Sequence, residues 1–239
     1  MSAPLATSAS SLEWYLTRST GAVALLLLTL TIALGVLDVK RWSTQRYPRF
    51  VIDSLHRNVS LLAISFLLIH ILTSIVDGFA HISIAAAVIP FVGSYRPFWL
   101  GLGAISFDLI LAVILTSLMR ARMGFASWRA IHWLAYASWP IALLHGLGTG
   151  SDVKSQWLLL LSVGCMIAVG VCVLARSLSG WPQNLGLRSA ALGATGAFAL
   201  FLVLWLPGGP LGSEWARRSG TPASLLAHHA APRRPRSTR

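Results

Sequence analysis

Six long apolar runs constrain this chain more than any other feature of its sequence. They cover residues 19–37, 54–76, 98–119, 130–148, 157–176 and 188–206, and charged residues, proline or glycine bound each run. A helix needs about 20 apolar residues to cross the ~30 Å hydrocarbon core of a bilayer. We therefore predict an all-α integral membrane protein, built as an up-down bundle of six transmembrane helices.

The charge content excludes several classes of protein. Only 11% of the 239 residues are charged, whereas a soluble domain carries about 25%. A soluble enzyme, a disordered regulator and a disulfide-stapled secreted domain are therefore ruled out. The net charge of +12 comes from basic residues between the apolar runs. This placement indicates contact with anionic lipid headgroups, and we expect no nucleic acid partner.

Basic residues in the short loops predict the orientation. They gather after the first, third and fifth runs, as Lys40, Arg41, Arg46 and Arg49, then Arg120, Arg122 and Arg129, then Arg176 and Arg188. The other two loops carry only Arg96 and Lys154. Basic loops favour the cytoplasmic side, so we expect a multi-pass plasma membrane protein with its N-terminus outside.

The same reasoning divides the chain into four parts. Residues 1–18 form an N-terminal segment without the pattern of a removable signal peptide. Residues 19–178 hold the five-helix core, and residues 188–206 form a sixth transmembrane helix. The basic tail, residues 207–239, is expected to be disordered and, after six crossings, to lie outside. The arginines of the tail conflict with an outside position, because basic residues favour the cytoplasmic side.

Four histidines inside two apolar runs are the candidate functional residues. His56 and His70 are 14 residues apart, which places them on one helix face and ~21 Å apart along the axis. His132 and His145 are 13 residues apart, which in an ideal helix places them roughly 140° apart. Pro140 lies between them, and a kink or local rewinding there would bring both onto one face.

The depths of these histidines predict two pairs. The two helices run in the same direction, so His56 and His132 lie near the cytoplasmic face, and His70 and His145 near the outer face. A six-coordinate iron porphyrin needs two axial ligands on opposite sides of its ring, and imidazole suits iron. We therefore predict two bis-histidine haem groups stacked across the membrane, with all four histidines as iron ligands.

Other interpretations of the histidines remain open. They could be buried residues that form hydrogen bonds within a structural scaffold, which would tolerate alanine at all four positions. They could also line a metal-ion transporter, which would be colourless and take up metal. A metal channel would be expected to have carboxylates beside the histidines, and only Asp108 lies deep in an apolar run.

The histidine pattern resembles the ferric reductase-like transmembrane domain. The residues that carry the resemblance are His56 and His70 in LHRNVSLLAISFLLIHIL, and His132 and His145 in AIHWLAYASWPIALLHGLG. This superfamily includes NADPH oxidases, ferric reductases and the haem-binding membrane subunit of methionine sulfoxide reductase systems. The resemblance implies two b-type haems and electron flow from the cytoplasmic side to the outer side.

The chain departs from that pattern in its soluble part. It carries no GxGxxG motif, so we expect a membrane oxidoreductase component that lacks its own flavin and nicotinamide domain. Flavin would enter only through a partner. The expected donor is a separate flavoprotein or a membrane quinol, and the expected acceptor is an outer-side protein or ferric iron. A quinol-dependent subunit of a two-component periplasmic reductase is the alternative within this class.

Two further residues are candidates for supporting roles. Arg57 follows His56 and could pair with a haem propionate, although it could equally extend to the lipid headgroups. Asp108 lies between the two haem levels and could accept a hydrogen bond from a ligand histidine or from a neighbouring helix. No residue of the chain is predicted to act as a catalytic acid or base, because the cofactor supplies the redox chemistry.

Overall fold

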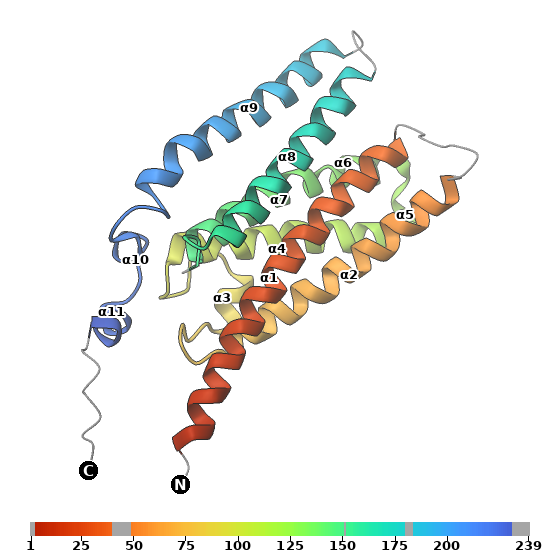
Figure 1. Ribbon diagram of the computed structural model, residues 1–239. Coiled ribbons are helices and arrows are strands. Elements are labelled where there is room, and N and C mark those ends of the chain that lie inside the picture. The colour runs from red at the N-terminus through yellow and green to blue at the C-terminus, as the bar shows by residue number, and fades with distance from the viewer. Residues whose placement is uncertain (1–2, 40–48, 151, 180–183, 231–239) are drawn as a thin grey trace, which may run out of the picture.

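A computed structural model describes residues 3–39, 49–150, 152–179 and 184–230. The cationic residues Lys40, Arg41 and Arg46 of the first loop, and residues 231–239 of the tail, lie outside these ranges. All regular structure in the described ranges is helical (Figure 1). The helices are α1 (Ala3–Val39), α2 (Arg49–Val76), α3 (Ile84–Val88), α4 (Pro97–Leu118), α5 (Arg120–Met123), α6 (Phe125–His132), α7 (Leu134–Thr149), α8 (Gln156–Leu178), α9 (Leu185–Gly208), α10 (Trp215–Arg218) and α11 (Ala223–Ala230).

Five of the described helices are long and apolar enough to cross a membrane. The spans are Leu12–Leu37, Phe50–Val76, Pro97–Leu118, Gln156–Leu178 and Leu185–Gly208. Many of their large apolar side chains are exposed, among them Leu72 and Leu204. In water such a surface would be an aggregation hazard, whereas in a bilayer it is solvated by lipid. The chain is therefore an all-helical, multi-pass membrane protein.

The predicted fourth span, residues 130–148, is not one continuous helix. It is divided into α6 and α7 at Trp133, whose backbone N–H bonds the carbonyl of Ala130 in a tighter turn. The 16 residues of α7 extend ~24 Å at 1.5 Å per residue, which is less than the bilayer core. The interruption also lies away from Pro140, where we expected it, and α7 continues through that proline.

The long helices form two packed pairs, and α8 and α9 lie outside these pairs. Helix α1 lies along α2 over most of its length, and α4 packs against α7 (Figure 1). Helix α8 covers α1, and α9 packs outside α8. The buried core joins these layers, and the indole N–H of Trp139 in α7 donates a hydrogen bond to Thr29 Oγ1 in α1 at 2.8 Å. The arrangement leaves α2 facing the α6–α7 pair.

The described part of the tail differs from the disorder that composition predicted. Residues 209–230 contain α10 and α11, and hydrogen bonds join this stretch to the helix bundle. The indole N–H of Trp215 donates to the carbonyl of Gly148 at 3.1 Å, and the backbone N–H of Arg96 donates to the carbonyl of Gly220. A composition rich in Pro, Ala, Ser and Arg cannot reveal these contacts, because they depend on residues more than 60 positions away.

The short helix α3 lies in the loop between α2 and α4, within the apolar stretch 82–92. Ser83 caps it, and its hydroxyl accepts a hydrogen bond from the backbone N–H of Ala86 at 3.2 Å. Ala86 is buried, and α3 packs against α4. The loop therefore closes one end of the space between α2 and α4.

Candidate functional site

The four membrane histidines form two opposed pairs. The ring centres of His56 and His132 are 6.4 Å apart, and those of His70 and His145 are 6.3 Å apart. One member of each pair lies on α2, and its partner lies on α6 or α7. Two separate elements thus present an imidazole from each side of the same space, at two levels.

The break at Trp133 separates His132 from His145, which both lie opposite histidines of α2. An uninterrupted helix would turn His132 and His145 roughly 140° away from each other. Residue 133 instead forms a turn between two helices, with φ −63° and ψ −20°. His132 is the last residue of α6 and His145 lies in the body of α7, so the two histidines belong to separate helices.

Backbone carbonyls orient three of the four imidazoles. The Nδ1–H groups of His56, His70 and His145 donate to the carbonyls of Thr31 at 3.1 Å, Thr17 at 2.7 Å and Trp99 at 2.9 Å, respectively. A carbonyl can only accept, so Nδ1 carries the proton in each ring. Nε2 is then the nitrogen with a free lone pair, and histidines that ligate metals are commonly held in this way.

A glycine gives each of these three histidines access to its carbonyl. Gly21, Gly35 and Gly103 each lie four residues after the residue whose carbonyl is used. A Cβ atom there would come within 2.9 Å of His70, 3.4 Å of His56 and 2.6 Å of His145, respectively.

The physical reason for the glycines lies in helix geometry. A side chain in an α-helix points toward the N-terminus and covers the preceding turn. The carbonyl at one position is therefore shielded by the side chain four residues later. Glycine removes that shield, and the imidazole can reach the helix surface. Sequence reasoning missed these glycines, although Gly21 and Gly35 have the same spacing of 14 as His56 and His70.

His132 has a different environment. Its Nδ1 atom is buried and has no hydrogen-bond partner in the part of the chain that the structure describes. The ring of Trp128 lies beside it, with ring centres 4.8 Å apart. Ser117, fourteen residues after Gly103 on α4, accepts a hydrogen bond from the Trp128 indole at 3.3 Å. Among the four histidines, His132 is thus the one that lacks both a carbonyl partner and an adjacent glycine in the described chain.

A cavity opens at the His70–His145 pair. It holds about 90 Å³ of free space, and both imidazoles line it. Its walls come from α1, α2, α3, α4 and α7 and are mostly apolar, with Leu28, Leu67, Ile71, Ile82, Ala86, Ala87, Leu100, Ala104, Phe107, Ile110 and Ala142 beside Ser74 and Ser106.

The spacing of the imidazoles matches two ligands of one metal ion. A metal–imidazole bond is about 2.0 Å, and a ring centre lies about 1.1 Å beyond its nitrogen, so two opposed ligands have ring centres about 6.2 Å apart. Each pair supplies only two ligands, and within the described ranges no group of three His, Cys, Asp or Glu side chains gathers at one point. Each pair therefore offers two imidazoles, without a third side-chain ligand of these types in the described part of the chain.

The other predicted residues lie apart from these pairs. Arg57 is exposed on α2, and the described chain brings no partner to its guanidinium. Asp108 is half-buried on α4, but the imidazoles that have Nδ1 partners use backbone carbonyls instead of its carboxylate.

Comparison with known families identifies the chain. The model of the family described as "Ferric reductase like transmembrane component" matches residues 20–143, slightly more than half of the sequence. The match includes His56, His70 and His132 and ends two residues before His145. Comparisons with curated proteins and with solved structures found no match. The chain therefore belongs to the ferric reductase-like transmembrane family.

Proposed function

We propose that this protein transfers electrons across a membrane through two haem b groups. His56 and His132 would hold one haem, and His70 and His145 the other, as axial ligands. The observation that carries the proposal is the pair of opposed imidazole sites with ring centres 6.3–6.4 Å apart. Family membership supports membrane electron transfer as the general activity.

The protein's own residues hold and orient the cofactor. The carbonyls of Thr17, Thr31 and Trp99 keep three imidazoles in the tautomer that leaves Nε2 free. When bound, haem supplies a one-electron iron couple. Second-shell hydrogen bonds raise the basicity of a ligand imidazole. The unpartnered His132 should therefore make the two sites differ in reduction potential.

The two sites can span the membrane between them. His56 and His70 are 14 residues apart on α2, which corresponds to ~21 Å of the ~30 Å bilayer core. An electron can thus cross the apolar layer in two steps. We place the N-terminus and the His70–His145 pair on the outer side of the plasma membrane, because the basic loops favour the cytoplasmic side.

The donor and the acceptor would be separate molecules. We propose a flavoprotein or a membrane quinol as donor, and an outer-side protein or ferric iron as acceptor. Addition of a short-chain quinol to the purified chain distinguishes the two donors: a quinol donor reduces the protein directly, whereas a flavoprotein donor leaves it oxidised until that enzyme and its nicotinamide are supplied. The chain would then act as the membrane component of a two-part oxidoreductase.

Absorption spectroscopy tests the haem assignment. The chain is purified in detergent after expression with ample haem, and oxidised and dithionite-reduced spectra are recorded with a haem-to-protein ratio. We expect b-type bands and about two haems per chain, reduced to about one by His70→Ala or by His56→Ala. A colourless protein that takes up metal ions would instead favour a histidine-lined metal transporter.

A matched control comes from a histidine outside the two pairs. His81 lies in the exposed loop before α3 and has a positive φ of 48°, a conformation that asparagine tolerates. His81→Asn should keep both haems. Equal loss of haem in this variant and in His70→Ala would mean that general damage to the fold, and not ligation, causes the loss.

A further inference from the structure

A C-terminal segment of the chain packs against the end of α7 that carries His145. This segment, residues 205–221, comprises the last turn of α9, α10 and the residues that follow. It lies outside the range matched by the family, residues 20–143. Its Trp215 donates a hydrogen bond to the carbonyl of Gly148 at 3.1 Å, three residues after His145.

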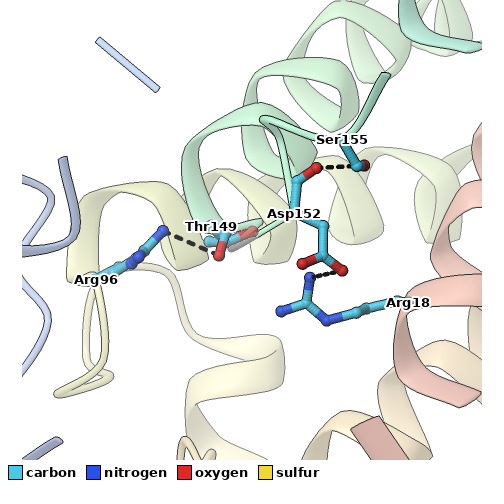
Figure 2. A network of polar contacts seen from close by, with 5 residues as sticks. All are labelled: Arg18, Arg96, Thr149, Asp152 and Ser155. Carbon is cyan, nitrogen blue, oxygen red and sulfur yellow. Dashed lines mark hydrogen bonds and ion pairs between the residues drawn. The ribbon is translucent and has the colours of Figure 1, made fainter. Parts of the chain in front are cut away.

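Arg96 connects the same two parts of the chain. Its guanidinium donates to the carbonyls of Gly148 at 3.0 Å and Thr149 at 3.1 Å, and its Nε–H donates to Thr221 Oγ1 at 3.0 Å. Its backbone N–H donates to the carbonyl of Gly220 at 3.1 Å. Only 4% of the residue is exposed, and its φ of 41° is left-handed. A residue with a strained backbone persists only where the surrounding structure holds it in place. Figure 2 shows the hydrogen bond between Arg96 and Thr149.

These contacts enclose Trp99, the residue that orients His145. The Trp99 ring packs against Trp205 and Trp215 of the C-terminal segment, with ring centres 4.9 Å and 5.2 Å away, and those two rings lie 5.8 Å from each other. Gly148 also lies against this ring, because a Cβ atom at that position would overlap it. The carbonyl of Trp99 accepts the Nδ1–H of His145 at 2.9 Å. A shift of Trp99 therefore changes the acceptor that sets the direction of the imidazole.

We propose that the C-terminal segment is a positioning element for His145, and that Arg96 and Trp215 hold it against Trp99 and the end of α7. This proposal rests on the proposed haem function and adds a part of the chain outside the family match. Arg96 and Trp215 do not touch the imidazole. They act through the Trp99 carbonyl and through the last turn of α7, whose Thr149 hydroxyl donates to the His145 carbonyl at 2.7 Å.

Two substitutions in the full-length chain test the proposal. Trp215→Phe keeps an aromatic ring and removes the hydrogen bond to Gly148. Arg96→Gln removes the hydrogen bonds of the guanidinium to Gly148, Thr149 and Thr221, and is the more severe change. Arg217→Gln is the matched control, because Arg217 lies on α10 but is exposed. Each is made in the wild-type chain and with His56→Ala, in which only the His70–His145 haem remains.

The readouts follow that haem directly. The first readout is the rate of haem transfer to an excess of apomyoglobin. The second is the electron paramagnetic resonance signal of the low-spin ferric haem, which depends on the orientation of the two imidazole planes. Loss of one hydrogen bond should speed transfer about two- to tenfold in Trp215→Phe. The resonance should shift as well, while Arg217→Gln leaves both readouts unchanged. In a His70→Ala background, only the haem between His56 and His132 remains. Its transfer rate and resonance should not change when Trp215→Phe or Arg96→Gln is added.

The outcomes separate this proposal from the haem assignment. If the wild-type chain binds two haems, but Trp215→Phe matches Arg217→Gln in transfer rate and resonance, the positioning role is wrong and the haem function stands. Equal acceleration at both haems would also overturn the proposal, because it would show general destabilisation. A wild-type chain without haem overturns both. Trp215→Phe decides the question even if Arg96→Gln does not fold.

Discussion

Substitution of Gly103 by alanine should weaken haem binding at the His70–His145 pair. The added Cβ would lie 2.6 Å from both Cε1 and Nδ1 of His145, about 1 Å inside the ordinary contact distance of ~3.5–4.0 Å. Both atoms belong to the rigid imidazole, so the whole ring must move. That movement pulls Nδ1–H away from the Trp99 carbonyl, 2.9 Å away, and misdirects Nε2.

The size of the effect follows from two contributions. Overpacking of a tight contact costs about 1–3 kcal/mol, and loss of the hydrogen bond costs about 1 kcal/mol. Together they amount to about 2–4 kcal/mol, or roughly a 30- to 1,000-fold weaker retention of haem at this site. Alanine also favours the helix by about 1 kcal/mol relative to glycine, so the chain without haem should not be destabilised to the same extent.

Haem-to-protein ratios and transfer to apomyoglobin measure this change. Gly35→Ala is the graded comparison, because its Cβ would lie 3.4 Å from His56 and requires a much smaller shift. Gly164→Ala is the neutral control, because nothing lies within 4 Å of its added Cβ. We expect retention to fall in the order Gly164→Ala, Gly35→Ala, Gly103→Ala. Wild-type retention of both haems in Gly103→Ala would refute the argument that glycine provides access to the carbonyl.

Two further predictions concern stability in detergent. Trp139→Phe removes the buried hydrogen bond to Thr29 and should lower the free energy of unfolding by about 0.5–1.5 kcal/mol, measured by thermal unfolding; an unchanged melting temperature would contradict a structural role for this bond. Arg18→Gln breaks the 2.6 Å ion pair with Asp152 (Figure 2), whose side chains are 23% and 29% exposed. This substitution should lower the free energy of unfolding by up to about 1 kcal/mol at low salt, and by less at high salt. The exposed Arg217→Gln should have no measurable effect in the same assay.

The membrane class and the candidate ligands could be predicted from the sequence because both depend on local properties. Hydropathy over about 20 residues selects a transmembrane helix regardless of its neighbours. The 14-residue spacing of His56 and His70 fixes their common face through helix periodicity alone. The structure accordingly has five long apolar spans, and it places each histidine of α2 opposite a histidine of α6 or α7.

The tertiary structure decided the features that depend on packing between distant segments. The break at Trp133 replaces the expected change at Pro140, and hydropathy does not register it because both sides of the break remain apolar. The carbonyl of Trp99 serves His145, 46 residues away, and that of Thr17 serves His70, 53 residues away.

The C-terminal segment shows the same limit most clearly. Its composition predicts disorder, yet Trp215 and Arg96 join it to the end of α7. Composition counts residue types within one segment, whereas order there comes from hydrogen bonds and ring contacts with residues far away in the chain. The sequence by itself thus determined a helical membrane protein with four candidate ligands at two depths. The packing of the helices decided which groups orient those ligands.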